Sequence, residues 1–546
     1  MPGPLGVHEN LRFLILEVRK QLGKTRQYFA DPSGEPVDSV FSKDDYIDTL
    51  KGVIQRKCFT LATQESHKSQ PELDHLKAID IIAVNLERIA DFCESILDQA
   101  RYIQDGELFG RHGFLPFFHS IESGLNYINP AVFKHDMESA LGVCRAEDEL
   151  DRLYVHALQQ SLRELKEGHE PQTLVTIIFM YRYLERMGDS LLNIGEAVLS
   201  CCLGESIKID QFQALDDSLE SSTMDHSIED VALEPIAETR SGCRIGRVRS
   251  QRPDKSRFAI FKEGAYDKLL NEKENIERWR QVAPDLVPQI FSFHQRGDSG
   301  SILFEYLPGR TFDEILLRGD NRELDAALDA LTGVLSEIWT ATRRPAPATA
   351  GFLDQLAKRL PDIYALHPEF YRPGTAINRV PVPSLEELIE KARPIDTKAV
   401  APFSVLIHGD LNIDNIIYRS DDGKLHFIDL HRSRMMDYAQ DVSVFLVSNL
   451  RLPIPDPGVQ RKVNRSVERV HDFALDFARN ADDPTFSARL ALGLARSLCT
   501  STRFVLDRSF AMSMFLRARY LLEHLIHGDQ SAKPGPVAKG IGQGFR

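Results

Sequence analysis

The sequence has 546 residues, more than a single hydrophobic core usually serves, so two or three domains are expected. Its formal net charge of −14 argues against a general nucleic-acid binder and against attraction to an anionic membrane. The seven cysteines show no C-x-x-C spacing, no apolar run approaches about 18 residues, and the N-terminus lacks a signal-peptide pattern. We therefore expect a soluble, cytoplasmic protein that neither binds nucleic acid nor inserts into a membrane.

Residues 11–203 carry an almost entirely helical pattern. In two segments, apolar residues recur at alternating steps of three and four, which is typical of helices in an antiparallel bundle. The first segment contains Ile79, Ile82, Leu86, Ile89, Cys93 and Ile96, and the second contains Ile177, Met180, Leu184, Met187, Leu191, Ile194 and Val198. This pattern predicts an all-α bundle.

The same two segments also share a short sequence motif. Residues 85–91 read NLERIAD and residues 183–189 read YLERMGD, and another pair of similar motifs, 45–50 and 148–153, precedes them in the same order. Two pairs of similar motifs that occur in the same order indicate an internal repeat of about 100 residues, with three helices in each copy. We place the copies at about residues 8–104 and 115–203, inside a helical domain of residues 1–205.

The L-E-R-[IM]-[AG]-D helix, present twice in a six-helix array, resembles the PhoU family of phosphate-response regulators. That family holds metal clusters on E-x-x-x-D helix faces, so the resemblance implies metal ligands at Glu87, Asp91, Glu185 and Asp189. Residues four apart share one helical face, so each Glu-Asp pair could present two carboxylates to a metal. The resemblance implies a transition metal or another divalent ion. The alternative is a solvated acidic face with local ion pairs. The domain lacks a nucleophile with a matched base, so we interpret it as a regulatory or docking module with a protein partner as a candidate.

Residues 206–235 are dense in Asp, Glu and Ser, and their middle part shows no sustained period. This composition predicts an acidic, flexible and self-repelling linker. We expect the second domain to cover residues 236–530 and a disordered tail to cover residues 531–546.

The second domain opens with strand patterns at residues 245–248 and 258–262, followed by a helical pattern that begins near residue 269. Lys262 ends the second strand pattern, and Glu272 lies early in the helix. A further strand pattern contains Glu305 and Leu307 and ends at a Pro-Gly pair. Beyond residue 311 the pattern is mainly helical.

The stretch from His408 to Asp429 contains the most informative spacing in the chain. Asp410 follows a short apolar run that suits a buried strand, and Asn415 lies five residues further on. Two apolar segments then flank an Asp-Gly pair, which is a good signal for a β-hairpin turn. Because the two ends of a hairpin lie side by side, Asn415 and Asp429 should return to the same end as Asp410. Converging amide and carboxylate oxygens suit a Mg²⁺ ion that also holds phosphate oxygens.

This order of residues is the catalytic-loop pattern of kinases, H-x-D-x-x-x-x-N followed by a metal-binding Asp after a short hairpin. The residues that fit it, together with the later D-x-x-x-D element, resemble the aminoglycoside phosphotransferase and choline kinase group over roughly residues 240–525: His408, Asp410, Asn415, Asp429, Asp437 and Asp441. The predicted fold class is therefore multidomain, with an all-α six-helix bundle of two three-helix repeats followed by an α+β bilobal protein-kinase-like fold. The alternative is a surface hairpin with scattered acids.

The resemblance implies ATP and Mg²⁺ as cofactors and the hydroxyl of a small molecule as phosphate acceptor. Asp410 would orient the hydroxyl and receive its proton, while Asn415 and Asp429 would hold Mg²⁺ against the phosphates. The other motif residues would give structural support: His408, Asp437 and Asp441.

The resemblance also implies nucleotide contacts in the smaller lobe. Lys262 would meet the phosphates and pair with Glu272, and backbone groups of Glu305 and Leu307 would meet the adenine. These residue types are common on protein surfaces, so the order of strand and helix is what favours the functional interpretation.

Three functional interpretations follow. The first is a small-molecule kinase governed by the PhoU-like domain, and the alternative is a phosphate-signalling regulator whose kinase lobe binds nucleotide with little or no transfer. Aminoglycoside resistance is a third and weaker interpretation, because the fusion suggests a regulatory setting. Basic residues in the last helices would suit an anionic acceptor, although ordinary surface charge is the stronger explanation: Arg496, Arg503, Arg508, Arg517 and Arg519.

Overall fold

The computed structural model describes residues 5–31, 44–64, 69–103, 107–168, 170–204, 207–222, 228, 231–235, 244–250, 258–452 and 456–528. The chain divides into two compact units, Met1–Glu263 and Gly264–Arg546. The predicted tail, the middle of the predicted linker at 223–227 and the expected domain start at residue 236 lie outside the described residues. No helix among the described residues combines the length and the apolar character that a membrane span needs.

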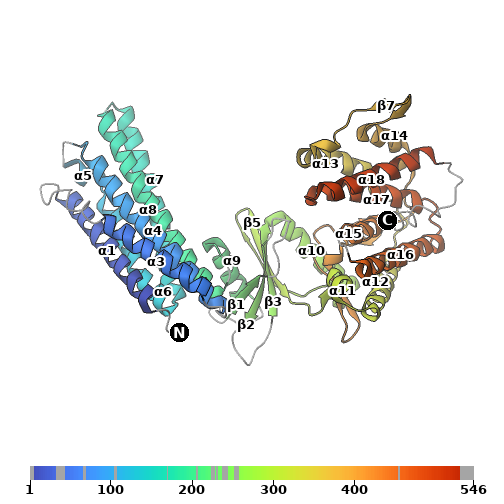
Figure 1. Ribbon diagram of the computed structural model, residues 1–546, viewed down its shortest axis with the longest axis horizontal. Helices are drawn as coiled ribbons and strands as arrows, with labels where there is room; N and C mark the ends of the chain where they lie inside the picture. The colour runs from blue at the N-terminus through green and yellow to red at the C-terminus, as the bar shows by residue number, and fades with distance from the viewer. Residues whose placement is uncertain are drawn as a thin grey trace. The chain divides into compact units, whose positions relative to one another are not determined.

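Long helices build most of the first unit, and three of them come from each predicted repeat (Figure 1). The first repeat contains α1 (Leu5–Ala30), α3 (Asp44–Gln64) and α4 (Gln70–Ala100), and the second contains α6 (Leu115–Lys134), α7 (Met137–Lys166) and α8 (Pro171–Leu203). The short helix α5 (Glu107–His112) lies between the repeats. Helices α4 and α8, which carry the matching motifs, pack along each other, and each also packs against helices of its own repeat.

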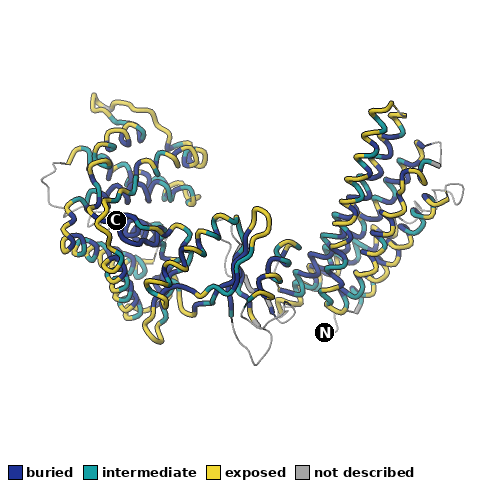
Figure 2. Tube along the Cα trace, turned by 180° about the vertical axis from the view of Figure 1, so that it is seen from behind, coloured by how far each residue is buried: buried dark blue, intermediate teal, exposed yellow. Residues whose placement is uncertain are grey.

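The apolar residues predicted for α4 and α8 form the core of this bundle. All of them are buried, and Figure 2 shows buried and exposed stretches alternating along the helices. Local sequence fixes the helix ends: Ser69 and Glu72 form a capping box at the start of α4, and α8 stops at Gly204, which has a φ of 78°. The predicted helical bundle is therefore confirmed.

The prediction of a flexible linker is wrong for residues 209–220. They form helix α9 (Ile209–Glu220), in which Phe212, Leu215 and Leu219 are buried at helical spacing. Glu196 of α8 holds the start of α9, because its carboxylate accepts a hydrogen bond from the Ile209 N–H at 3.1 Å. The acids of this segment occupy the other face of α9, so the acidic composition concealed a short apolar stripe.

The linker prediction is also wrong for residues 231–235, which form strand β1 (Val231–Pro235). Strand β1 pairs with β2 (Arg244–Ser250), and β2 pairs with β3 (Phe258–Ala265), both in antiparallel order. The second unit then begins with α10 (Tyr266–Val282) and the hairpin of β4 (Ile290–Arg296) and β5 (Ser299–Glu305). These short strands, followed by many helices, give the α+β arrangement that the sequence predicts for the second half of the chain.

The rest of the second unit is mainly helical and surrounds one hydrophobic core. Its helices are α11 (Phe312–Arg318), α12 (Asn321–Thr342), α13 (Phe352–Leu366), α14 (Leu385–Lys398), α15 (Ala439–Leu450), α16 (Pro457–Asn480), α17 (Phe486–Ser501) and α18 (Arg508–His527). Its strands are β6 (Arg310–Thr311), β7 (Thr375–Ile377), β8 (Val380–Val382), β9 (Val405–Ile407), β10 (Ile416–Arg419), β11 (Lys424–Phe427) and β12 (Arg434–Met436). Strand β10 lies between β11 and β6, while β12 pairs with β9. These small sheets carry the loops described next.

Candidate functional site

The predicted hairpin is confirmed. Strands β10 and β11 are antiparallel, with Ile416 opposite Phe427, and the turn between them contains Gly423 with a φ of 71°. At the open end, the N–H of Ile428 donates to the carbonyl oxygen of Asn415 at 3.1 Å. Asn415 and Asp429 therefore lie at the same end of the hairpin.

Asp410 follows β9 and lies in the loop that leads to this end. Its Oδ2 is 2.9 Å from an Nη1 of Arg432, and its Oδ1 accepts a hydrogen bond from Nδ2 of Asn412 at 2.9 Å. The carbonyl oxygen of Asp410 accepts a second amide hydrogen bond, from Nδ2 of Asn415 at 2.9 Å. This contact fixes the side chain of Asn415 and directs its Nδ2 toward the loop, which leaves Oδ1 as the atom able to bind a cation.

The donor set at this end of the hairpin fits Mg²⁺. Asn415 offers an amide oxygen and Asp429 a carboxylate, and oxygen ligands of this kind are the ones that Mg²⁺ takes from proteins. Asp429 has a φ of 60°, an uncommon conformation for a residue other than glycine, and its Oδ1 lies 3.1 Å from Nδ1 of His431. Such backbone strain is typical of functional sites.

Asp441 of α15 fixes the backbone of this loop through hydrogen bonds. Its carboxylate accepts the backbone N–H groups of His408 and Gly409, each at 2.7 Å. Burial raises the pKa of Asp441 to about 7, although the hydrogen bonds from the two N–H groups favour the ionised form and act in the opposite direction. Gly409 has a φ of 83°, and a Cβ at this position would lie 2.2 Å from the carbonyl oxygen of Arg432. The backbone before Asp410 is therefore fixed by a buried carboxylate and by a requirement for glycine.

His408 links this loop to the hairpin. It is fully buried, its Nε2 lies 3.0 Å from the carbonyl oxygen of Ile428, and its Nδ1 accepts the N–H of Asp410 at 3.3 Å. Burial lowers the pKa of His408 to about 4, so the ring is neutral near pH 7. Its contacts position Asp410 relative to the residue before Asp429.

Helix α10 supports the segment after Asp429 through contacts that the sequence did not reveal. Nδ2 of Asn275 donates to the carbonyl oxygen of Leu430 at 2.9 Å, and Nε1 of Trp279 donates to Oγ of Ser433 at 2.6 Å. Ser433 donates in turn to the carbonyl oxygen of Ile407 at 2.6 Å. The two loops that carry Asp410 and Asp429 are thus joined to each other and to one helix.

A buried ion network lies beside the start of α15. Arg489 of α17 donates to Asp437 at 2.8 and 3.2 Å and to Asp483 at 2.9 and 2.6 Å. The hydroxyl of Tyr438 donates to Asp483 at 2.7 Å. Burial raises the pKa of Asp437. Burial acts in the same direction on Asp483, but the hydrogen bonds from Arg489 and Tyr438 have the larger effect, so the pKa of Asp483 is lowered. Sequence reasoning found Asp437 and missed its partner Arg489.

Two family models match this chain. Residues 258–482 match the phosphotransferase enzyme family, and residues 12–100 and 118–198 each match the PhoU domain. The chain joins a PhoU domain to a phosphotransferase domain. Both resemblances seen in the sequence are confirmed, and the second PhoU match confirms the internal repeat.

Known proteins resemble one domain or the other. A phosphate-specific transport system accessory protein PhoU homolog from Caulobacter vibrioides is 26% identical over 216 residues, which are 36% of this chain and 90% of that protein. Among solved structures, an aminoglycoside phosphotransferase from Streptomyces rimosus is 20% identical and covers 54% of this chain and 93% of its own, with a TM-score of 0.32. A choline kinase from Cryptosporidium parvum is 10% identical and covers 57% and 96%, with a TM-score of 0.36.

The residues predicted to contact nucleotide lie on ordered elements. Lys262 is a buried residue of β3 in the first unit, and Glu272 is a buried residue of α10 in the second. Glu305 ends β5 and donates its N–H to the carbonyl oxygen of Gln289 at 2.8 Å, while Leu307 is buried just beyond the strand. Their roles toward ATP stay predictions.

The predicted metal-binding acids of the PhoU domain mostly form ion pairs. In the first repeat, Glu87 lies 2.5 Å from Nζ of Lys51, while Asp91 is exposed. In the second, Glu185 pairs with Arg182, and Asp189 lies 3.4 Å from Arg186. These contacts match the alternative of local ion pairs, and metal binding at these faces stays a prediction.

In the second repeat, burial and neighbouring carboxylates raise the pKa values of two glutamates. Burial and the nearby carboxylates of Asp151 and Asp148 raise the pKa of Glu147 to about 7, and burial followed by Asp189 raises the pKa of Glu185. In the first repeat, the cation of Lys51 lies between Asp48 and Glu87. The two repeats therefore differ in their electrostatics.

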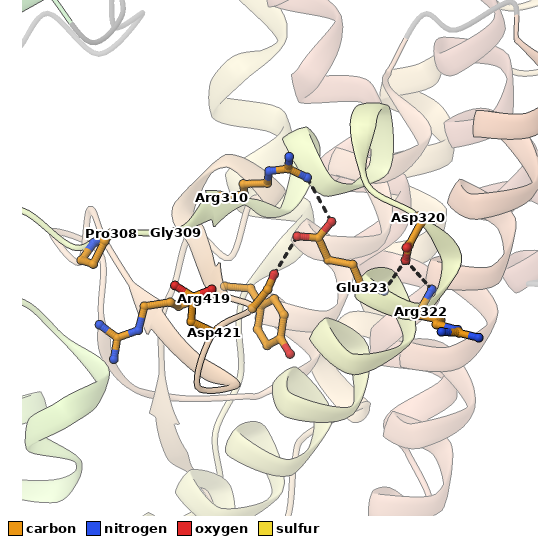
Figure 3. A pocket seen from close by; sticks show the side chains of 10 residues that line it. Pro308, Gly309, Arg310, Asp320, Arg322, Glu323, Arg419 and Asp421 are labelled. Atoms are coloured by element: carbon orange, nitrogen blue, oxygen red, sulfur yellow. Dashed lines mark hydrogen bonds and ion pairs between the residues drawn. The ribbon is translucent and has the colours of Figure 1, made fainter.

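A polar cavity of about 660 Å³ lies at the closed end of the hairpin (Figure 3). Arg310 and Glu323 form an ion pair at 3.0 Å on its wall, and Oγ of Ser420 donates to Glu323 at 2.7 Å. Tyr418 of β10, the lining residue nearest to Asn415 in the chain, lies three residues beyond it, roughly 10 Å at the usual rise of a strand. The cavity is therefore distinct from the Asp410 site.

Proposed function

We propose that this chain is an ATP- and Mg²⁺-dependent phosphotransferase that acts on a hydroxyl group of a small molecule and is controlled by its PhoU domain. The supporting observation is the convergence of Asp410, Asn415 and Asp429 at one end of the hairpin. The loop before Asp410 is held by Asp441, so the geometry is fixed before any ligand binds.

Each residue has a defined task in this proposal. Asp410 accepts the proton of the acceptor hydroxyl, and Asn415 and Asp429 hold the cation. Bound Mg²⁺ would neutralise charge on the transferred phosphate. Because phosphoryl transfer needs positioning and charge neutralisation more than covalent help, the rigidity of these loops matters most.

A buried arginine beside the loop favours an anionic acceptor. Arg496 of α17 is 9% exposed, and its Nη2 donates to Oε1 of Gln440 at 2.6 Å. Gln440 donates in turn to the carbonyl oxygen of Gly409, the residue before Asp410, at 3.2 Å. Among the described residues, nothing accepts a hydrogen bond from Nε of Arg496. A buried guanidinium with an unused N–H beside a catalytic loop suits an acidic group of a ligand.

Further arginines surround the same position. The pKa of Arg496 is lowered to about 10, mainly by burial; the carboxylate of Asp410 opposes this shift, while the positive charges of Arg432 and Arg359 add to it. Arg503, whose pKa is lowered by burial and then by Arg359, has an acidic partner in Asp362 at 3.3 Å. A group of four arginines thus lies beside the carboxylates of Asp410 and Asp362: Arg496, Arg503, Arg432 and Arg359. Such a site attracts a hydroxyl compound with a carboxylate or phosphate group and disfavours a cationic aminoglycoside.

One observation favours the alternative, a regulator that binds nucleotide without transferring phosphate. Both carboxylate oxygens of Asp410 already have partners, Arg432 and Asn412. An anionic acceptor would draw Arg432 away from Asp410, whereas in a regulator the ion pair would persist in every ligand state.

Phosphate transfer from ATP to pooled hydroxyl compounds, sorted into acidic, neutral and cationic pools, distinguishes these possibilities. We expect transfer to the acidic pool by the wild type and by Asp421→Asn, an exposed acid of the same hairpin, and none by Asp410→Asn. Transfer to the cationic pool alone would show that the acceptor class is wrong. Nucleotide binding without transfer to any pool would support the regulator.

A further inference from the structure

Imidazole and thiol groups gather at one end of the helical bundle. His75 lies near the start of α4, His135 directly follows α6, and Cys201 lies near the end of α8. A fourth group, His8, lies near the start of α1. Because these helices run in alternating directions, their starts and ends meet at the same end of the bundle.

The three potential ligand atoms of His75, His135 and Cys201 lie within 4.8 Å of one another. Sγ of Cys201 is 3.7 Å from Nδ1 of His75, and the rings of His75 and His135 have centroids 5.2 Å apart. In a tetrahedral zinc site, ligand atoms are about 3.4–3.8 Å from one another, as follows from the usual bond lengths. The cluster needs only a small contraction to reach this geometry. Within the described part of the chain, this is the one set of three such groups that lies so close together.

The histidines are in the protonation state that a metal requires. Burial lowers the pKa of His75 to about 4 and also lowers the pKa values of His8 and His135, so all three rings are neutral near pH 7. Nε2 of His75 lies 2.8 Å from Nε2 of His8. When Nε2 of His75 carries the hydrogen and donates it to His8, the lone pair of Nδ1 is directed toward Cys201. An outer partner that fixes a histidine tautomer in this way is typical of metal sites.

We propose that the PhoU domain binds one zinc-class ion through His75, His135 and Cys201, with His8 orienting His75. Two imidazoles and one thiolate are ligands for Zn²⁺ or Co²⁺ and not for Mg²⁺. Three protein ligands leave a fourth position open for water or another ligand. Burial raises the pKa of the Cys201 thiol to about 12, so this thiol is protonated near pH 7 until the metal binds and its proton leaves to solvent.

This site is separate from the acidic helix faces. Glu87 lies twelve residues beyond His75 on α4, about 18 Å along the helix axis at the usual rise. Acidic faces supply oxygen ligands, whereas this cluster supplies nitrogen and sulfur, so the two kinds of site would select different metals.

The position of the site connects it to α9. Ser200, next to Cys201, accepts the N–H of Ile207 at 3.1 Å and donates to the carbonyl oxygen of Ile207 at 3.3 Å. Ile207 leads directly into α9 (Ile209–Glu220). A bound ion would stabilise the end of α8 and, through Ser200, the segment that continues toward the phosphotransferase domain.

Cobalt titration of the metal-free, reduced full-length chain tests the proposal. We expect one Co²⁺ per chain, an absorption band from thiolate-to-cobalt charge transfer, and displacement of Co²⁺ by Zn²⁺. Cys201→Ser should abolish the band, while Cys202→Ser, which alters the neighbouring half-buried thiol, should retain it. His8→Gln should keep the band but weaken Co²⁺ binding about 10–100-fold, as expected for an outer partner.

Three results of the cobalt titration with the wild type and the cysteine variants would overturn the proposal. They are the absence of a thiolate band in the wild type, a band that survives Cys201→Ser, and a band that Cys202→Ser removes. If Cys201→Ser does not fold, His135→Gln serves instead, because His135 is exposed at the end of α6 and its loss should still weaken Co²⁺ binding more than about tenfold. Binding that is lost only in Glu185→Gln would assign the ion to the acidic faces and contradict the proposal.

Discussion

Replacing Arg489 by Met should destabilise the phosphotransferase domain strongly. Arg489 makes four charge-assisted hydrogen bonds to Asp437 and Asp483, and both carboxylates are buried. Removing one partner of a buried ion pair costs about 3–5 kcal/mol, because an uncompensated charge stays buried. Here two carboxylates lose their cation, so we expect a loss in the upper half of that range at pH 8.

The loss should depend on pH. Without Arg489, burial raises the folded-state pKa values of Asp437 and Asp483 above the unfolded value of about 4. A carboxyl group with a raised folded-state pKa contributes stability that is present at low pH and is lost as pH rises through that pKa. The stability difference between wild type and Arg489→Met should therefore be smaller at pH 5 than at pH 8.

Tryptophan fluorescence during urea unfolding measures this effect in the correct domain. The chain has two tryptophans, Trp279 and Trp339, and both are buried in the second unit. Arg479→Met is the matched control, because Arg479 pairs with Asp476 at an exposed surface and should cost less than about 1 kcal/mol. A loss for Arg489→Met that equals the control, or that is the same at both pH values, would refute the reasoning.

Three further substitutions have clear expected outcomes. Gly409→Ala should lower the free energy of unfolding by about 2 kcal/mol or more in the same assay, because φ at this position is positive and the new Cβ would meet the Arg432 carbonyl oxygen. Gly333→Ala is the control: this glycine lies in open space on α12, so the change should stabilise the domain by up to about 1 kcal/mol. Leu215→Ala should lower the free energy of unfolding by about 2–5 kcal/mol and speed amide hydrogen exchange throughout α9. Asp217→Ala, at an exposed position of the same helix, should leave the exchange rates unchanged. Equal exchange rates in the two variants would show that α9 does not depend on this core contact. Glu147→Gln should raise the melting temperature of the PhoU domain at pH 8 but not at pH 4. Because the folded-state pKa of Glu147 is raised, the wild type loses stability as pH rises from about 4.5 to about 7. A gain in melting temperature at pH 4 that matches the gain at pH 8 would contradict this assignment.

Local sequence patterns predicted the hairpin and the bundle well. The five-residue spacing from Asp410 to Asn415 and the Asp-Gly turn determine which side chains meet, since a hairpin brings its own ends together. The heptad-like pattern of α4 and α8 likewise determines their buried faces. Such features depend on neighbours in the chain, so one sequence suffices to read them.

Contacts between distant segments were not predictable in the same way. Arg489 and Asp437 are separated by 52 residues, and His75 and Cys201 by 126, without any motif that links them. Sequence patterns show that Asp437 needs a partner but do not show which arginine the fold supplies. Helix α9 was missed for a different reason, because its many acids outweighed the short apolar stripe of Phe212, Leu215 and Leu219.

In the proposed function, Asp410 serves phosphate transfer from ATP to a hydroxyl compound. The most direct measurement compares wild type and Asp410→Asn for transfer to the acidic acceptor pool, with ATP binding measured on the same samples. We predict that both proteins bind ATP with Mg²⁺ and that only the wild type transfers phosphate. Equal transfer by both proteins, or ATP binding with no transfer by the wild type to any pool, would contradict the account.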